Sequence, residues 1–366
     1  MANISTAASP HTLFPILPSG PVGMARLAAE AEHADDGHLI EFKTMESRSI
    51  LNKTVSKRGM WMAYSINPYR GCEFGCKYCY ARYTHEFLLP VKASVETPRL
   101  SEVQQPFALA FEREIYLKEN AAWLLEQELK KIDPKQDIAL GTATDPYQPI
   151  ERRVGITRSI LEVFAQKSGY RLGIVTKSTL IERDIDLLAE IGRKNRLVVH
   201  LTITSTDSEL ARILEPRAPR PDLRFAAVKK LREAGITTGV LCSPLLPGIT
   251  DNEQALDAVA KRAAEAAASF LSAQPLFLKS CSRPTYLSFV REHFPQLAGE
   301  YARRFAKMDF ADAPYRRHLA LMLKRVSHKH GLGERFSDIV PPQEVGELRK
   351  GPLGVRTGGA QGLLFA

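Results

Sequence analysis

Apolar and polar positions follow two different periods along the middle of the chain, from about residue 60 to residue 277. Short apolar runs, typical of buried strands, are followed by stretches whose apolar residues lie three or four positions apart, as in amphipathic helices. The strand pattern predicts strands at 63–67, 137–145, 171–178, 196–205, 237–248 and 269–278. Helical spacing falls between most of them, at 156–169, 181–195, 220–235 and 252–267.

Strands that alternate with helices predict a parallel sheet joined by right-handed crossovers. Six such units form either an open doubly wound sheet or an incomplete barrel. No glycine-rich phosphate loop follows the first strand, which weakens the dinucleotide-binding alternative. In parallel α/β folds the carboxyl ends of the strands form the active face, so polar residues just after the strands are candidate site residues. They are Thr144 and Asp145, Thr176 and Lys177, and Thr204 and Ser205.

Three of the five cysteines lie within eight residues, in the run NPYRGCEFGCKYCYAR. Cys72, Cys76 and Cys79 have the spacing C-x3-C-x2-C, which in a reducing compartment indicates metal binding rather than disulfides. Three thiolates can hold three irons of a [4Fe-4S] cubane, and the fourth iron is then free to bind a small molecule.

The alternative is a structural zinc site, which usually takes four Cys or His ligands. The second pair of cysteines that such a site would need is missing, and a helix expected after Cys79 would carry His85 away. We therefore favour the iron–sulfur interpretation. Cys242 and Cys281 are isolated, and we expect both to be small buried apolar residues.

The run CEFGCKYCYAR resembles the signature of the radical S-adenosylmethionine (SAM) superfamily. Further runs resemble its spore photoproduct lyase-related branch, namely TATDPYQPIE, IVTKS, LTITS, LEPRAPRPDLRFAAVKKLREAGI and SPLLPGITD. Together they cover about residues 64–252. The resemblance implies an α/β fold with an incomplete (β/α)6 TIM-like barrel, which agrees with the strand count. It also implies reductive cleavage of SAM to a 5′-deoxyadenosyl radical by the [4Fe-4S] cluster.

The same resemblance suggests which residues form the cofactor pocket. Tyr78 would lie against the adenine, and Lys177 would pair with the carboxylate of the cofactor. Thr144 and Asp145 would lie near its methionine or ribose part, and Thr204 and Ser205 would contact ribose or methionine atoms. The alternatives are an Asp-Pro turn at Asp145 and a solvated strand end at Lys177. Glu215 and Arg217 are further candidates for cofactor or substrate contacts.

One departure from the branch concerns the hydrogen donor. Spore photoproduct lyases carry a hydrogen-donating cysteine at the position that matches Thr142. A threonine hydroxyl is a far poorer hydrogen-atom donor than a thiol, so we do not expect repair of spore photoproduct by that mechanism. Tyr80 is a candidate radical relay, and its alternative role is packing.

Composition is ordinary for a globular protein, with 44% hydrophobic and 25% charged residues. No apolar run approaches the roughly 20 residues that span a bilayer, and the N-terminus lacks the pattern of a secretory signal. We expect a cytoplasmic protein that does not enter a membrane. The net charge of +9 favours an anionic partner, and residues 281–366 hold 14 Lys plus Arg against 8 Asp plus Glu.

We therefore expect a nucleic-acid substrate, DNA over RNA, with lesion repair or modification as the process and with lyase-like or modifying chemistry. One rival is a radical SAM enzyme that acts on a protein or small molecule. Another is a zinc-dependent nucleic-acid-binding module without catalysis. A one-electron donor such as flavodoxin or ferredoxin would be a further partner of the enzyme.

Four regions are expected along the chain. They are a partly disordered N-terminal extension (1–55), the core barrel (56–280), a basic helical C-terminal region (281–345) and a flexible tail (346–366). The tail ends in QGLLF, which resembles the peptide with which bacterial repair proteins dock on the replication sliding clamp. Docking would use Gln361, Leu364 and Phe365. The alternative is a tail that folds back on its own protein.

Overall fold

The six strands expected from the sequence form one parallel sheet in a computed structural model, which describes residues 39–54, 62–88 and 106–333. Their bounds are β3 (Tyr64–Ile66), β6 (Asp137–Leu140), β7 (Arg171–Thr176), β8 (Arg196–Thr202), β9 (Thr238–Leu245) and β10 (Leu271–Pro275). The order is β10-β9-β8-β7-β6-β3-β2, and only β2 (Leu51–Lys53) runs antiparallel, against β3. Within the described ranges no ladder joins β10 to β2, so the sheet is open and the incomplete barrel is confirmed.

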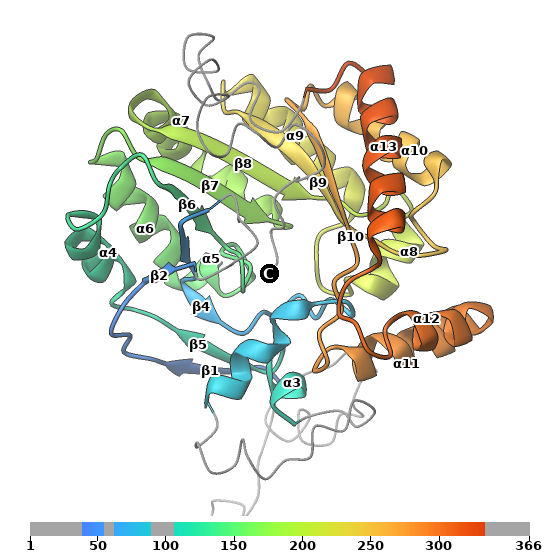
Figure 1. Ribbon diagram of the computed structural model, residues 1–366. Coiled ribbons are helices and arrows are strands. Elements are labelled where there is room, and N and C mark those ends of the chain that lie inside the picture. The colour runs from blue at the N-terminus through green and yellow to red at the C-terminus, as the bar shows by residue number, and fades with distance from the viewer. Residues whose placement is uncertain (1–38, 55–61, 89–105, 334–366) are drawn as a thin grey trace, which may run out of the picture. The chain divides into compact units, whose positions relative to one another are not determined.

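Helices cover the outer face of this sheet (Figure 1). The longer ones are α6 (Ile156–Ala165), α7 (Ile185–Lys194), α9 (Pro221–Glu233) and α10 (Glu253–Glu265), and the shorter are α5 (Glu151–Val154), η2 (Thr179–Asp184) and α8 (Ser208–Leu214). Local signals set their ends. Asn252 caps α10 by accepting a bond from the N–H of Ala255, and Gly235 ends α9 at a positive φ of 77°. The apolar faces of the helices pack on the sheet and form the larger core cluster.

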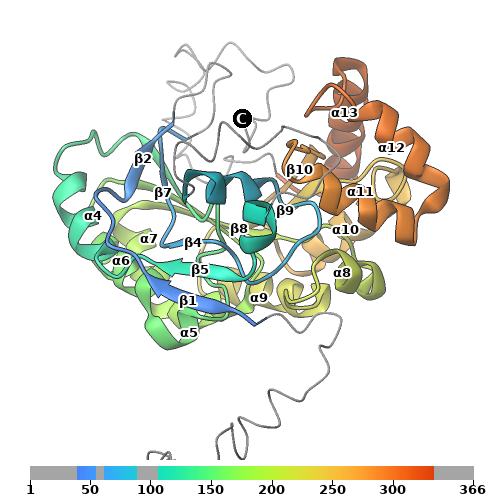
Figure 2. The same cartoon turned by 90° about the horizontal axis from the view of Figure 1, so that it is seen from below.

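A second, smaller sheet has the order β1-β5-β4, with β1 (Glu41–Thr44) parallel and β4 (Tyr69–Arg70) antiparallel to β5 (Glu114–Leu117) (Figure 2). Next to β5 in the chain are α3 (Pro106–Ala110) and α4 (Ala121–Leu129). β1 lies in the stretch that the sequence assigned to the N-terminal extension. β4 leads directly into the cysteine run, so this sheet fixes one end of the cysteine loop.

The C-terminal region is helical, as expected, with α11 (Arg283–His293), η3 (Pro295–Leu297), α12 (Ala298–Arg304) and α13 (Ala313–Lys329). α13 buries the apolar residues Leu319, Met322, Leu323 and Val326. Its outer ion pairs reach α10, where Arg325 lies 3.1 Å from Glu253 and Lys329 lies 2.8 Å from Asp257. This layer therefore belongs to the packed fold as well as carrying positive charge.

Two expectations fall on other parts of the chain. The sliding-clamp motif at Gln361, Leu364 and Phe365 lies outside the described residues, as does most of the expected N-terminal extension. No helix in the described ranges is long and apolar enough to cross a membrane.

Candidate active site

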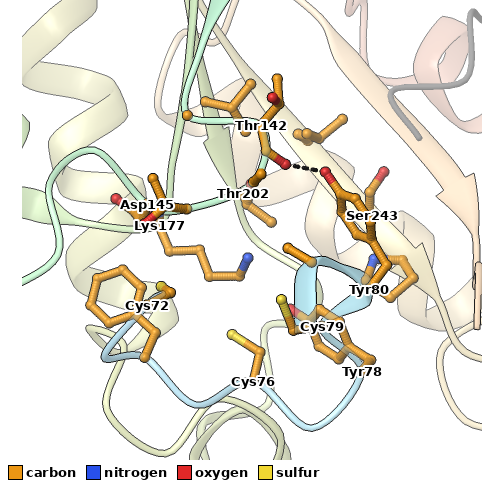
Figure 3. A pocket seen from close by; sticks show the side chains of 18 of the residues that line it. Cys72, Cys76, Tyr78, Cys79, Tyr80, Thr142, Asp145, Lys177, Thr202 and Ser243 are labelled. Carbon is orange, nitrogen blue, oxygen red and sulfur yellow. Dashed lines mark hydrogen bonds between the residues drawn. The ribbon is translucent and has the colours of Figure 1, made fainter. Parts of the chain in front are cut away.

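A pocket opens at the carboxyl ends of the parallel strands, where the sequence placed the active face (Figure 3). Including its open mouth, it holds about 810 Å³ of empty space. One wall is the cysteine loop, with Cys72, Cys76 and Cys79 all among the lining residues. The opposite wall consists of strand ends and the turns that follow them. The three cysteines of the loop therefore face one cavity.

The cysteine loop owes its shape to two glycines. Gly71 has a φ of +89°, and a Cβ there would lie 2.6 Å from the carbonyl oxygen of Glu114. Gly75 has a φ of +62°, and its Cβ would lie 2.6 Å from Oε2 of Glu112 and closer still to Nη2 of Arg217. Only glycine combines this backbone conformation with such close approach. The loop is further tied by a bond of 3.0 Å from the N–H of Cys72 to the carbonyl of Phe111.

Burial raises the pKa of all three loop thiols, and for Cys76 it raises the pKa to about 12. Thiols in such a site ionise when a metal ion coordinates them. No group of three or more Cys, His, Asp or Glu side chains in the described ranges converges on a single metal ion. Three thiolates that each bind a different iron of a cubane need not converge, so the donor set fits a [4Fe-4S] cluster.

Lys177 extends its ammonium group from the end of β7 toward the three thiols (Figure 3). Its Nζ lies 5.7 Å from the centre of the Tyr78 ring and forms no ion pair with a described residue. Burial lowers the pKa of Lys177, but the neighbouring Cys76, Glu215 and Asp145 outweigh this and leave the pKa raised. The pocket thus contains a persistent cation available to an anionic ligand.

Asp145 lines the pocket, but its carboxylate oxygens accept hydrogen bonds from neighbouring groups of the protein. Oδ1 accepts bonds from the hydroxyl of Thr176 at 2.6 Å and the N–H of Tyr147 at 2.9 Å, and Oδ2 accepts from the N–H of Lys177 at 2.7 Å. Burial raises the pKa of Asp145, and these bonds oppose that rise. Asp145 therefore orients the strand end that carries Lys177. Thr144 donates to the carbonyl of Gly71 at 2.5 Å and so joins the same turn to the cysteine loop.

Tyr78 is held by a buried ion pair behind the pocket. Its hydroxyl donates to Oε1 of Glu215, whose Oε2 lies 2.6 Å from Nη2 of Arg224. Burial opposes ionisation of Glu215, but Arg224 and Lys177 leave its pKa lowered. Thr204 also contacts Glu215, at 3.5 Å, so the sequence candidate Glu215 lies at the centre of this network.

The structure places Thr204 and Ser205, the last pair of candidates from the sequence, outside the pocket lining. Thr204 contacts Glu215, and Ser205 accepts a bond of 3.0 Å from the N–H of Asp207, just before α8. The lining residues at these strand ends are instead Thr202, Ser243 and Gln274. The oxygen of Ser243 is buried and has no hydrogen-bond partner in the described structure. The predicted ribose contacts of Thr204 and Ser205 stay predictions.

Thr142 also lines the pocket, and its carbonyl oxygen accepts a hydrogen bond from the hydroxyl of Tyr80 (Figure 3). The isolated cysteines are both buried, as expected, and neither is a lining residue. Cys242 donates to the carbonyl of Thr204 at 3.6 Å, and Cys281 lies 3.7 Å from the hydroxyl of Ser282.

Comparison with known proteins supplies the family. The sequence model described as the Radical SAM superfamily matches residues 66–259, which is more than half of the chain. The chain belongs to the radical SAM superfamily. It is therefore an enzyme of the class that uses a [4Fe-4S] cluster and SAM, and the expectation of these two cofactors is confirmed.

Relatives of this chain occur in Mycobacterium tuberculosis and Methanocaldococcus jannaschii. An uncharacterized protein of Mycobacterium tuberculosis is 31% identical over 307 residues, covering 84% of this chain and 86% of its own. An uncharacterized protein of Methanocaldococcus jannaschii is 32% identical over 190 residues, which is 52% of this chain and 63% of that protein.

Among solved structures, spore photoproduct lyase complexed with dinucleoside spore photoproduct superposes with a TM-score of 0.56 at 14% identity. A mutant of that enzyme with bound AdoMet and the same dinucleoside gives 0.54 at 15% identity. Each comparison covers 85% of this chain and 83% of the other. At these identities the likeness shows the radical SAM fold.

The shape of the cysteine loop yields a first prediction. Gly71→Ala is expected to destabilise the protein because its Cβ would lie 2.6 Å from the carbonyl oxygen of Glu114 and 2.9 Å from that of Phe111, and these backbone atoms cannot swing away as a side chain can. Overpacking of this kind costs roughly 1–3 kcal/mol beyond the penalty for a positive φ. Gly155→Ala is the matched control, because Gly155 has a φ of +65° and a Cβ there would have nothing within 4 Å. Denaturant unfolding of the cofactor-free protein measures both, and equal losses of stability would contradict the prediction.

Proposed function

We propose that Cys72, Cys76 and Cys79 ligate the [4Fe-4S] cluster and that the adjoining pocket binds SAM for radical chemistry on nucleic acid. The observation that carries the first part is the shared cavity, into which three thiols and the Lys177 ammonium all project. When bound, the cluster supplies the electron that cleaves SAM and so generates the 5′-deoxyadenosyl radical. A reducing cytoplasm, with flavodoxin or ferredoxin as electron donor, suits such a centre.

Different residues of the pocket would bind different parts of SAM. The carboxylate of SAM would pair with Lys177, since a buried cation without an ion-pair partner among the described residues favours an anionic ligand. Tyr78, held by Glu215, would offer its ring to the adenine. The unpartnered hydroxyl of Ser243 and the side chain of Thr202 would bond to the sugar or to the amino-acid part. Pocket walls that are mainly apolar would exclude water from the radical.

A row of aromatic rings extends from this pocket. It supports the proposal that the substrate has a flat group such as a nucleic-acid base. Tyr80 and Phe277 line the pocket with centroids 5.9 Å apart, and Phe277 stacks on Phe310 at 4.4 Å. Tyr83 lies 6.5 Å from Tyr80, and Nζ of Lys279 lies 3.9 Å from the centre of the Tyr83 ring. Aromatic rings combined with cations are the usual means of holding unstacked bases.

The helix α13 begins three residues after Phe310 and carries exposed positive charge. Arg316, Arg317 and Lys324 are exposed on α13 and form no ion pair with a described residue. Such cations suit the phosphate backbone of a strand whose base enters the pocket. The substrate we favour is DNA over RNA, and the process is repair or modification of a base.

Thr142 distinguishes this reaction from that of the branch it resembles. The residue lies on the pocket wall, where the resemblance would place a hydrogen-donating thiol. We therefore propose that hydrogen is not returned to the substrate from this position. The radical would take a hydrogen atom from the nucleic acid, and 5′-deoxyadenosine would be the product on the cofactor side.

Binding at rising salt tests the choice of substrate. The affinity for single-stranded DNA is expected to fall linearly on a log–log plot against salt. Replacing Arg316, Arg317 and Lys324 together by glutamine is expected to reduce that slope by about 0.7 for each of these cations that binds a phosphate of the single strand. Arg212→Gln is the control, because Arg212 is exposed but pairs with Glu209. An affinity that stays constant across the salt range, or binding to peptides in place of DNA, would favour the rival substrate classes.

A further inference from the structure

Three charged side chains from separate segments meet behind the cysteine loop. Arg82 comes from η1 (Tyr80–Leu88), Glu112 follows α3, and Arg217 follows α8. Oε2 of Glu112 lies 3.4 Å from Nη2 of Arg82 and 3.2 Å from Nη2 of Arg217. One carboxylate oxygen therefore joins two guanidinium groups, and we call this arrangement the Arg–Glu–Arg bridge.

Both arginines of the bridge also hold the backbone of the cysteine loop. Nη2 of Arg82 donates to the carbonyl of Cys76 at 3.2 Å, and Nη1 donates to the carbonyl of Ala108 at 2.8 Å. Nε of Arg217 donates to the carbonyl of Glu73. The tip of the loop at Gly75 packs directly on the bridge, because a Cβ there would collide with Arg217 and Glu112. The bridge thus contacts the loop on both sides of its tip.

The bridge is shielded from water and carries an excess positive charge. The side chains of Arg82, Glu112 and Arg217 are 0%, 10% and 18% exposed. Two guanidinium groups outweigh one carboxylate, and charges in such surroundings are weakly screened. Nε of Arg82 has no hydrogen-bond partner in the described structure. When the three thiolates of the loop bind iron, the cluster would therefore lie beside a fixed positive charge.

We propose that the Arg–Glu–Arg bridge is a positioning element that fixes the cysteine loop and tunes the reduction potential of the cluster the loop holds. This inference rests on the proposed ligation by Cys72, Cys76 and Cys79. The potential of an iron–sulfur cluster depends on nearby charge and on hydrogen bonds around it. Reduction adds negative charge, so the positive bridge favours the reduced form.

The charge arrangement predicts shifts of opposite sign for two variants. Glu112→Gln removes the negative charge while its amide oxygen can still accept from both arginines, so the midpoint potential should become more positive. Arg217→Gln removes a positive charge, so the potential should become more negative. Arg217→Lys keeps the charge and should return the potential toward the wild-type value. A bridge that only supported folding would change cluster content without giving shifts of opposite sign.

The test is a redox titration of the anaerobically reconstituted full chain, with the reduced cluster followed by electron paramagnetic resonance and iron and sulfide measured alongside. Arg220→Gln is the control, because Arg220 forms an exposed ion pair with Asp222 and should leave the potential unchanged. Opposite shifts support the inference. If both variants hold the cluster but their midpoint potentials are unchanged, or shift in the same direction, the inference is wrong. A wild-type chain that binds no iron–sulfur cluster overturns the proposed ligation itself, and the inference with it.

Discussion

Replacing Cys76 by alanine is expected to abolish both cluster assembly and formation of 5′-deoxyadenosine. Cys76 lies in the middle of the loop and lines the pocket with the other two thiols. With one thiolate removed, the chain retains two of the three protein ligands that a cubane with one free iron requires. Iron and sulfide content after anaerobic reconstitution, together with chromatographic detection of 5′-deoxyadenosine, measure the loss.

The chain offers a matched control for this substitution. Cys242 is also buried, but it donates to the carbonyl of Thr204 and does not line the pocket. Cys242→Ala should therefore retain the cluster and its activity. A Cys76→Ala variant with a full complement of iron and sulfide would show that the loop is not the site of the cluster.

Replacing Lys177 by methionine is expected to weaken SAM binding by roughly 10- to 100-fold. A hydrogen bond to a charged group contributes about 1.5–3 kcal/mol, and each tenfold change in Kd corresponds to about 1.4 kcal/mol. Methionine keeps most of the apolar stem, so the missing charge dominates the effect. Equilibrium binding of SAM to the reconstituted protein measures Kd directly, without turnover.

A second lysine separates this effect from a general loss of charge. Lys230 is exposed and pairs with Glu182 at 2.5 Å on the outside of the fold. Lys230→Met should leave the Kd for SAM unchanged. If Lys177→Met bound SAM as tightly as the wild type, the ammonium would not be the partner of the cofactor carboxylate.

The parallel sheet could be predicted from the sequence because each of its six strands is a short apolar run between helical stretches. Strand β8, for example, has six buried residues in a row from Leu197 to Thr202. The strands of the smaller sheet give no such signal. β1 has four residues, of which three are exposed, and β4 has only two. Their positions depend on pairing with β5, a contact between distant segments that local periodicity does not contain.

The cysteine loop and Lys177 could be predicted because spacing and strand ends are local features. The other lining residues could not be predicted in the same way, because the sequence does not show at which residue each strand ends. β8 ends at Thr202, and the chain then turns so that Thr204 faces Glu215. Ser243 and Gln274 lie inside β9 and β10, so a search for polar residues just after the strands does not select them. The Arg–Glu–Arg bridge joins residues as far apart as 82 and 217, and no motif connects them.

The most direct test of the central claim is reductive cleavage of SAM by the anaerobically reconstituted wild-type chain. Given a one-electron reductant, the protein is predicted to contain iron and sulfide and to convert SAM into 5′-deoxyadenosine and methionine. A chain that holds zinc in place of iron and sulfide, and that leaves SAM intact under the same reducing conditions, would contradict the account.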